Sequence, residues 1–448
     1  MASTYLTRTM SGNSNQRVFT LSAWVKRNGL GRQVIMGVGG SGSYAMELYF
    51  QSGNQIDWWN YFNNSYAGRK VTNRKFRDIN AWYHIVARWD TTDSTAANRM
   101  RLYVNGVEET SFSTDSNPSQ NTTSEWNSGS VHEIGRNGDS SYCFDGAMSH
   151  IHFVDGSSLA PTVFGETDST TGEWQINASP SFTPGSNGFT ILKDGNTVTD
   201  QSANSNDFSV AAGTLTDLKD CPSNIFATLN TLTKSASALT INKGNNSKGS
   251  SSSNSWRSVV SNLGVSTGKY YFEIKVDNIE SSDPNNFAVG ITDYEQSDNQ
   301  SSTNGKFFAF SRGYGYYAGN GKKVNNDSAV ANGVAYGDSF TTGDIVGCAF
   351  DLDNGKIYFS KNGTWQNSGD PTSGSTGTGS AFNITTGYTY FPVMAQYYSA
   401  EQYSFNFGNG YFGTTAVSSA GTNASGIGIF EYDVPTGYTA LSTKGLNL

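Results

Sequence analysis

Short runs of alternating apolar and polar residues recur along the whole chain. In the first third they occupy four segments: 19–25, 82–89, 101–104 and 146–154. Alternation with a period of two predicts β-strands that turn one face toward a core. The pair Asn105-Gly106 follows the third segment and predicts a type I′ hairpin. We therefore expect a β-sandwich over residues 1–176.

The same pattern returns in the second half of the chain. Its apolar runs lie at 270–276, 287–291, 344–350, 356–360, 391–395 and 403–407. They predict a second β-sandwich over residues 231–430. Residues 177–230 are rich in Ser, Asn, Pro and Gly but keep scattered apolar side chains, so we expect an ordered connector there, and we assign residues 431–448 to a C-terminal extension. No run predicts an amphipathic helix of three turns, and the chain is expected to be all-β.

Composition supports this prediction. The 448 residues include 50 Gly, and aromatic residues make up 13% of the chain. Charged residues make up only 15%, against about 25% in an average soluble domain. Glycine and asparagine suit tight turns, and aromatic residues favour strands and argue against disorder.

Charge and cysteine content exclude several classes of protein. The net charge is −8 and no basic run is present, so we expect neither nucleic-acid binding nor attraction to an anionic membrane. Cys143, Cys221 and Cys348 show no metal-site spacing and no disulfide framework. No apolar run approaches the length of a membrane span, so no membrane insertion is expected. Without an apolar N-terminal signal, we expect synthesis and folding in a cytoplasm.

Two families share long segments with this chain. The segments FTLSAWVKR (19–27), WYHIVARWD (82–90), RLYVNGVEE (101–109) and FDGAMSHIHFVDGSSL (144–159) resemble the laminin-G-like domains. The segments GKYYFEIKV (268–276), GDIVGCAFDLDNGKIYFSKNG (343–363) and FPVMA (391–395) resemble the SPRY domain. Both resemblances imply a concanavalin A-like jelly roll. The fold implied is therefore two concanavalin A-like β-sandwich domains in tandem.

A third resemblance concerns function. Residues 144–174, 220–230 and 430–448 are similar to segments shared by virion-associated proteins of marine bacteriophages. This resemblance implies a tail-fibre, head-fibre or capsid-decorating protein at the virion surface, made in the host cytoplasm. Its implied partners are other virion proteins, such as a tail adaptor or the capsid, and a glycan or protein on the host cell. A homo-oligomer, with a trimer favoured, is expected by analogy with fibres.

Three functions compete on this basis. The first is a non-enzymatic receptor-binding component, favoured because tandem sandwiches with long polar loops are typical of recognition modules. The second is a structural capsid decoration or head fibre, favoured by the lack of a heptad run or shaft. The third, a polysaccharide depolymerase, is disfavoured because no Glu-x-Asp-x-x-Glu strand is present.

Clustered aromatic residues are the candidates for ligand binding. Flat rings with a polar edge contact sugars at low entropic cost. Consecutive aromatics in a strand also fill both faces of a sheet, so about half of each cluster is expected in the core. The outward half would serve a glycan or a neighbouring subunit. The candidates are Trp58, Trp59, Tyr61 and Tyr66 in one cluster, Tyr314, Tyr316 and Tyr317 in a second, and Tyr397 and Tyr398 in a third.

Calcium is the one cofactor that the resemblance to laminin-G-like domains implies. Laminin-G-like sandwiches often hold Ca²⁺ at the sheet rim, and oxygen ligands suit this ion. Asp90 and Asp93 flank one loop, and Asn137 and Asp139 flank another. Acidic loops are also common without a metal, so a protein with no cofactor stays the alternative.

The remaining polar residues favour structural roles. Asp351 and Asp353 lie in DLDNG, where a turn is favoured over catalysis. Glu47 and Glu133 fall in or near strands without a hydrolase motif around them. His150 and His152 share one strand face and lack a third metal ligand, so we expect an exposed pair that binds no metal.

Overall fold

The computed structural model describes most of the chain, and its secondary structure is strands joined by turns and 3-10 segments. The described residues are 4–39, 44–79, 81–138, 142–169, 172–193, 197–230, 239–242, 246–248, 254–280, 286–293, 305–327 and 333–447. The chain divides into two compact units, Met1–Asp217 and Leu218–Leu448. Among the described residues, no helix is long and apolar enough to cross a membrane.

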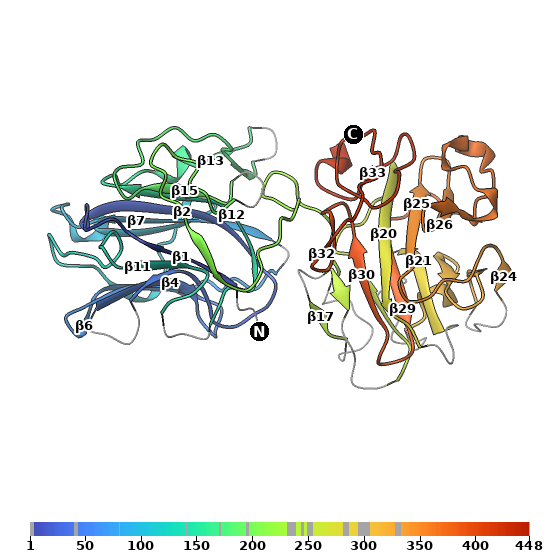
Figure 1. The fold of residues 1–448 in the computed structure, drawn as a ribbon, viewed down its shortest axis with the longest axis horizontal. Coiled ribbons are helices and arrows are strands. Elements are labelled where there is room, and N and C mark those ends of the chain that lie inside the picture. Colours follow the sequence, from blue (N-terminus) through green and yellow to red (C-terminus); the bar gives the residue numbers. More distant parts are fainter. Residues whose placement is uncertain are drawn as a thin grey trace. The chain divides into compact units, whose positions relative to one another are not determined.

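The first unit is a sandwich of two antiparallel sheets (Figure 1). The eight-stranded sheet runs in the order β10 (Phe112–Ser116), β6 (Ser65–Thr72), β5 (Ile56–Phe62), β4 (Tyr44–Phe50), β3 (Gln33–Val38), β11 (Val131–Ile134), β1 (Tyr5–Thr9) and β16 (Ser209–Ala212). The six-stranded sheet runs β15 (Phe189–Ile191), β12 (Gly146–Asp155), β2 (Val18–Arg27), β7 (Trp82–Asp90), β8 (Met100–Val104) and β9 (Val107–Glu108).

The core of the first unit follows the alternation seen in the sequence. Every second residue of β2, including Phe19 and Leu21, is fully buried between the sheets. The outer face of the six-stranded sheet is also covered. The hairpin of β13 (Gly165–Thr167) and β14 (Trp174–Ile176) lies over it, and Phe164 and Phe182 pack beside this hairpin. Burial on both sides explains why the neighbouring residues Ser22 and Trp24 are buried as well.

The second unit repeats this architecture. One sheet runs β17 (Ile241–Asn242), β18 (Ser247–Lys248), β30 (Gln402–Asn406), β20 (Lys269–Asn278), β25 (Ile345–Asp351), β26 (Lys356–Lys361) and β27 (Thr364–Trp365), with β28 (Phe382–Asn383) on β26 and β33 (Thr439–Ala440) on β20. The other runs β19 (Arg257–Val260), β29 (Tyr390–Gln396), β21 (Phe287–Asp293), β22 (Gly313–Tyr317), β23 (Lys322–Val324) and β24 (Val334–Ala335).

Small elements complete the two units. A two-stranded ribbon pairs β31 (Tyr411–Phe412) with β32 (Thr415–Ala416). The described 3-10 segments are Ala96–Asn98, Pro161–Val163, Phe307–Ala309, Gln366–Ser368, Pro371–Thr376 and Gly445–Asn447. The prediction of an all-β chain of two tandem sandwiches is confirmed.

The structure divides the predicted connector between the two units. In the first unit β15 pairs with β12 and β16 pairs with β1, so residues up to 217 extend its sheets. In the second unit Ala227 donates its N–H to Leu441, and Phe226 pairs with Ser442. The residues assigned to a C-terminal extension are thus an integral part of the second unit. Sequence composition did not reveal this because such pairings join segments far apart in the chain.

Candidate functional site

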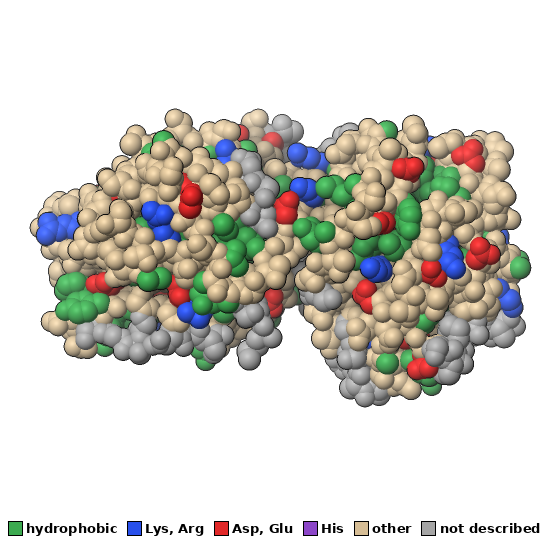
Figure 2. All heavy atoms as spheres, viewed as in Figure 1, with side chains coloured by type: hydrophobic (Ala, Val, Ile, Leu, Met, Phe, Trp, Pro, Cys, Tyr) green, Lys and Arg blue, Asp and Glu red, His purple; other side chains and the backbone are tan. Residues whose placement is uncertain are grey.

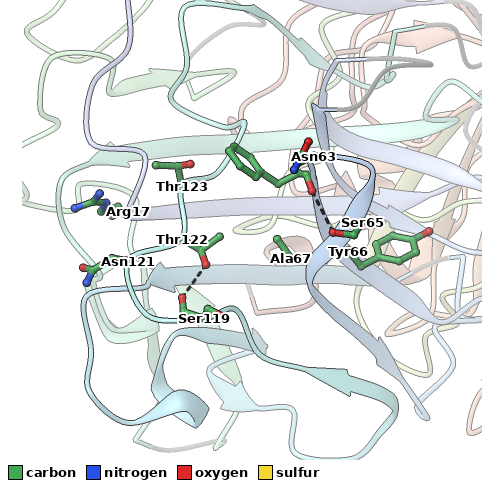
Figure 3. Close-up of a pocket in the computed structure, with 10 residues that line it drawn as sticks. Arg17, Asn63, Ser65, Tyr66, Ala67, Ser119, Asn121, Thr122 and Thr123 are labelled. Atoms are coloured by element: carbon green, nitrogen blue, oxygen red, sulfur yellow. Dashed lines mark hydrogen bonds between the residues drawn. The ribbon is translucent and has the colours of Figure 1, made fainter.

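A polar pocket opens at the rim of the first unit, where the β5–β6 hairpin faces the loop 119–123. Its volume is about 590 Å³. Figure 3 shows Arg17 and Asn121 on one side and Asn63 and Ser65 on the other, with Ala67 between them. The lining residues are Arg17, Phe62, Asn63, Ser65, Tyr66, Ala67, Ser119, Asn121, Thr122 and Thr123.

The hairpin wall is fixed by its tight turn. Asn63 and Asn64 have φ values of 50° and 61°, a left-handed conformation that asparagine tolerates better than most residues. The Oγ of Ser65 donates to the carbonyl of Phe62 at 3.3 Å, and the Oη of Tyr61 donates to the carbonyl of Asn64 at 2.9 Å. This wall is therefore ordered before any ligand arrives.

The opposite wall is held equally firmly. The Oγ1 of Thr122 donates to the carbonyl of Ser119 at 2.8 Å, closing the loop on itself. Thr91 ties the loop to the strand region before β2, because its Oγ1 donates to Thr122 and its N–H donates to the carbonyl of Arg17. Asn60 adds a third tie, since its Nδ2 donates to the carbonyl of Thr123 at 3.1 Å.

Several polar side chains in the pocket are left open to a ligand, and four of them offer the strongest polar groups. The side chains of Arg17, Asn63, Asn121 and Thr123 have no hydrogen-bond or ion-pair partner within the part of the chain that the structure describes. Together they offer a guanidinium, two amides and a hydroxyl from three separate segments. Preformed walls with convergent polar groups are typical of small-ligand sites.

An aromatic cluster lies on the other side of the β5–β6 hairpin. Tyr66 packs edge-on against Tyr61 and Trp59, with ring centroids 5.2 and 5.9 Å apart. The guanidinium of Arg69 sits 4.7 Å from the Tyr66 ring centroid and is held by the buried carboxylate of Asp57. Tyr66 is 50% exposed. In Figure 3 its ring is directed away from the loop 119–123, while the residue also lines the pocket.

Trp58 is not a binding residue. It is fully buried, and its ring lies 6.1 Å from Trp89 and 6.2 Å from Trp126 in the core of the first unit. The strand β5 alternates, so Trp58 points inward where Trp59 and Tyr61 point outward. One of the four residues of this cluster thus lies in the core, fewer than the expected half, and Trp59, Tyr61 and Tyr66 remain candidates.

The prediction for the second aromatic cluster is wrong. Tyr314, Tyr316 and Tyr317 of β22 are all buried. Tyr316 stacks on Phe359 at 5.2 Å between the two sheets. Tyr317, on the opposite face, packs 5.1 Å from Phe308 of the 3-10 segment that covers the sheet. Periodicity could not show that both faces of this strand are covered.

Tyr397 and Tyr398 are half-buried in the second unit. Both backbone N–H groups donate to Oε2 of Glu401, and the Tyr397 ring lies 6.1 Å from Trp256. The two rings meet edge-on at 5.1 Å. The pair is thus a fixed surface feature next to the buried carboxylate of Glu401.

The candidate calcium ligands lie at opposite ends of the first unit. Asp90 pairs with Val18 at the start of β2 and accepts the N–H of Thr92, and Asp93 accepts the N–H of Thr95. These are local turns that need no metal.

The second predicted calcium loop follows β11 near the other end of β2. Asn137 is buried there. A Cβ atom added to Gly37 would lie only 2.5 Å from the Cβ of Asn137, so the two residues pack closely. Asp139 lies outside the described residues. The described residues hold no group of three or more His, Cys, Asp or Glu side chains placed to hold a metal ion.

The acidic candidates are occupied by neighbours. Arg32 binds Glu47 at 3.1 Å and Arg136 binds Glu133 at 2.9 Å. Burial raises the pKa of Glu47, although the Arg32 charge opposes it. Asp351 accepts the N–H groups of Asp353 and Asn354, as expected for a strand followed by a turn.

The described histidines are buried, so the expectation of an exposed pair at His150 and His152 is wrong. The ring centroids of Phe164 and Phe182 each lie 5.5 Å from that of His152 and cover it. Desolvation by burial lowers the pKa of His152 to about 3.

His84 forms a contact that resembles a catalytic Ser–His pair. Its Nε2 lies 2.8 Å from the Oγ of Ser22, while its Nδ1 accepts the indole N–H of Trp174 at 3.0 Å. Because Nδ1 accepts, the neutral ring carries its proton on Nε2 and donates to the serine. The imidazole therefore has no lone pair directed at the serine hydroxyl, and this geometry suits a structural clamp.

Sequence analysis missed most of the pocket. Arg17, Asn63, Ser119, Asn121 and Thr123 belong to no motif. The available signal was the Asn63-Asn64 turn beside the aromatic cluster. The loop 119–123 gave no signal because only folding brings it against that turn.

Two family models match this chain. Residues 2–164 match the concanavalin A-like lectin/glucanases superfamily, and residues 269–410 match the SPRY domain. The prediction of a laminin-G-like domain followed by a SPRY domain is thereby confirmed.

Curated relatives match a short part of the chain. The Ran-binding proteins 9/10 homolog of Drosophila melanogaster is 33% identical over 98 residues, which are 22% of this chain and 9% of that protein. The dual specificity protein kinase splA of Dictyostelium discoideum is 30% identical over 103 residues, 22% of this chain and 4% of that protein. The chain thus spans less than a tenth of either relative.

Three solved structures resemble parts of the chain at low TM-score. The SPRY domain of human HERC1 is 17% identical, covers 40% of this chain and 96% of its own, and has a TM-score of 0.30. A native heptameric SAP-like pentraxin from Limulus polyphemus is 18% identical, with coverages of 35% and 71% and a TM-score of 0.27. Domain 4 of AbnA, a GH43 arabinanase from Geobacillus stearothermophilus in complex with arabinotriose, is 18% identical, with coverages of 34% and 65% and a TM-score of 0.26.

Proposed function

Since this chain carries a concanavalin A-like domain followed by a SPRY domain, we propose that it is a non-enzymatic recognition protein that binds a saccharide in the rim pocket of its first domain. One observation carries this proposal. Arg17, Asn63, Asn121 and Thr123 line the pocket from three separate segments and have unpartnered polar side chains among the described residues. Sugars present hydroxyl groups that accept and donate hydrogen bonds, which amide and hydroxyl side chains match.

The finer role that we propose is attachment of a virus particle to its host. Its support is the similarity of residues 144–174, 220–230 and 430–448 to segments of phage virion proteins. In this role the pocket would contact a host glycan, and the outer aromatic cluster of Trp59, Tyr61 and Tyr66 would widen the recognition surface. The expected assembly is a homo-oligomer at the virion surface.

A structural role on the capsid is the second candidate. The aromatic cluster favours it, because an exposed Tyr66 beside half-buried rings also suits contact with a neighbouring subunit. Location on purified particles separates the two roles. Antibody labelling at the tail tip supports attachment, whereas labelling spread over the head in many copies supports decoration.

Binding by the pocket is testable with the full chain. We expect Asn121→Gly and Thr123→Val to weaken binding to the best saccharide of a neutral and acidic panel, each about fivefold, the loss of about one hydrogen bond. Glycine is chosen at Asn121 because its φ is 63°. Isothermal titration calorimetry measures the affinity.

The matched control is Thr110→Val, which changes an exposed threonine of the same unit outside the pocket. It should bind like the wild type, and all three variants should keep the wild-type melting temperature. Unchanged affinity in both pocket variants would place binding elsewhere. Shortening of the saccharide during the titration would instead support the depolymerase alternative.

A further inference from the structure

The rim pocket is asymmetric in charge. Its ten lining residues include one cation, Arg17, and no carboxylate. The chain as a whole carries a net charge of −8. The one charged group in the pocket lining is therefore a guanidinium, although the protein as a whole is acidic. Such a pocket suits an anionic ligand better than a cationic one.

The position of Arg17 is fixed by its own backbone. Its N–H donates to Oδ1 of Asn15 at 3.2 Å, and its carbonyl accepts the N–H of Thr91 at 2.9 Å. The side chain is exposed and has no ion-pair partner in the described ranges. Asp90, which pairs with the neighbouring residue Val18, accepts the N–H of Thr92 in its own turn. The guanidinium therefore keeps its donors available.

Guanidinium groups bind planar and tetrahedral oxyanions through paired N–H donors. Around Arg17 the open groups are the neutral amides of Asn63 and Asn121 and the hydroxyl of Thr123. Neutral amides and hydroxyls match sugar hydroxyls, whereas the guanidinium matches a carboxylate or sulfate. The two kinds of donor share one pocket of about 590 Å³, which is large enough for a small oligosaccharide.

We propose that the pocket selects an anionic saccharide, that is, a sugar unit bearing a carboxylate or sulfate group that Arg17 binds while Asn63, Asn121 and Thr123 bind its hydroxyls. This inference rests on the proposed saccharide binding and adds its ligand class. It also assigns Arg17 as the residue that determines specificity.

A matched pair of ligands tests the charge. Oligogalacturonide and its methyl ester have the same sugar backbone, but only the first is charged. We expect the full chain to bind the acid at least tenfold more tightly than the ester, the magnitude of one charge-assisted contact. A sulfated galactan oligosaccharide and its unsulfated form repeat the comparison and distinguish sulfate from carboxylate as the favoured anion.

Variants of Arg17 connect the preference to this residue. Arg17→Gln should remove the preference for the acid, so that the ratio of acid to ester affinity falls by about tenfold. Arg17→Lys keeps the positive charge, so it should lose less of the preference for the acid than Arg17→Gln does. Arg77→Gln removes an exposed arginine of the same unit outside the pocket and should change neither affinity.

The outcomes separate this inference from the proposed function. If the wild type binds the charged and uncharged forms equally, or if Arg17→Gln keeps the full preference, anionic selection is wrong while saccharide binding stands. If no saccharide binds and the pocket variants behave like the wild type, the proposed function fails and anionic selection fails with it.

Discussion

Gly106 connects a turn that the sequence predicts to a contact that it does not. Its φ is 77°, as the Asn105-Gly106 hairpin requires. A Cβ on Gly106 would also lie 2.4 Å from the ring of Trp174, which covers the turn. That ring stacks on His84 with centroids 5.9 Å apart. The residue is thus constrained twice, by backbone conformation and by the lack of space.

Substitution of this glycine separates the two constraints. We expect Gly106→Ala to lower the free energy of unfolding of the first unit by about 3 kcal/mol, from left-handed strain plus displacement of the indole. Gly172→Ala is the control, because Gly172 has a similar φ of 73° and open space around it. It should cost only about 1 kcal/mol. Thermal denaturation measures both, and equal losses would contradict the role of Trp174.

The burial of single residues explains where sequence analysis of the site succeeded. Alternation predicted that neighbouring residues of β5 face opposite sides without saying which faces the core, and the structure places Trp58 inward and Trp59 outward because β5 has a core on one side only. The same rule did not work for Tyr317, since the segment around Phe308 covers the outer face of β22. The alternation within a strand shows which residues share a face. It does not show whether a distant segment of the chain packs on that face.

At the scale of elements, the C-terminal segment is bound to the central strand β20. The carboxylate of Glu273 accepts the N–H groups of Glu431 and Tyr432, both at 2.9 Å, and the Oη of Tyr271 at 3.0 Å. Further along, β33 pairs in parallel with Tyr270 and Tyr271. The side chain of Glu273 is fully buried. Its hydrogen bonds hold the C-terminal segment against β20.

This contact predicts the effect of a single isosteric change. In Glu273→Gln one acceptor oxygen becomes an N–H₂ donor that faces another N–H, so a buried donor loses its partner. We expect the free energy of unfolding of the second unit to fall by about 2 kcal/mol. Hydrogen exchange should increase first over residues 430–442. Glu431→Gln, which alters a partly exposed carboxylate bonded to Ser418, is the control and should stay within about 0.5 kcal/mol. Equal protection in both variants would show that β33 holds the segment without Glu273.

On the scale of the whole molecule, the largest pKa shifts of buried histidines and acids run in opposite directions in the two units. In the first unit burial lowers the pKa of His84 to about 3 and that of His132 to about 4, as it does for His152. In the second unit burial raises the pKa of Glu273 to about 7 and that of Glu401 to about 8.

The units should therefore respond oppositely to acid. Between pH 6.5 and about 4 the unfolded first unit binds protons that its folded histidines do not, so its stability falls as the pH falls. At pH 5 the loss is about 2 kcal/mol for each histidine. Between pH 4.5 and about 7 to 8 the folded second unit keeps protons on its glutamates that the unfolded state releases, so its stability rises as the pH falls.

Calorimetry of the full chain at pH 7.5, 6.5 and 5.5 should resolve this behaviour as two transitions that shift in opposite directions. Glu401→Gln should reduce the shift of the second transition and leave the first unchanged. Movement of both transitions in the same direction would show that other groups dominate the pH dependence.

The sequence by itself determined the strands, the hairpin turns and the order of the two sandwiches, because side-chain alternation and turn residues act within a few neighbours along the chain. Tertiary structure alone decided that residues 177–217 complete the first unit, that residues 430–448 complete the second, and that both faces of β22 are buried. It also decided the pocket, since Arg17, the Asn63 turn and the loop 119–123 come together only when the sheets stack. Contacts between segments far apart in sequence depend on the three-dimensional path of the chain, which local patterns do not encode.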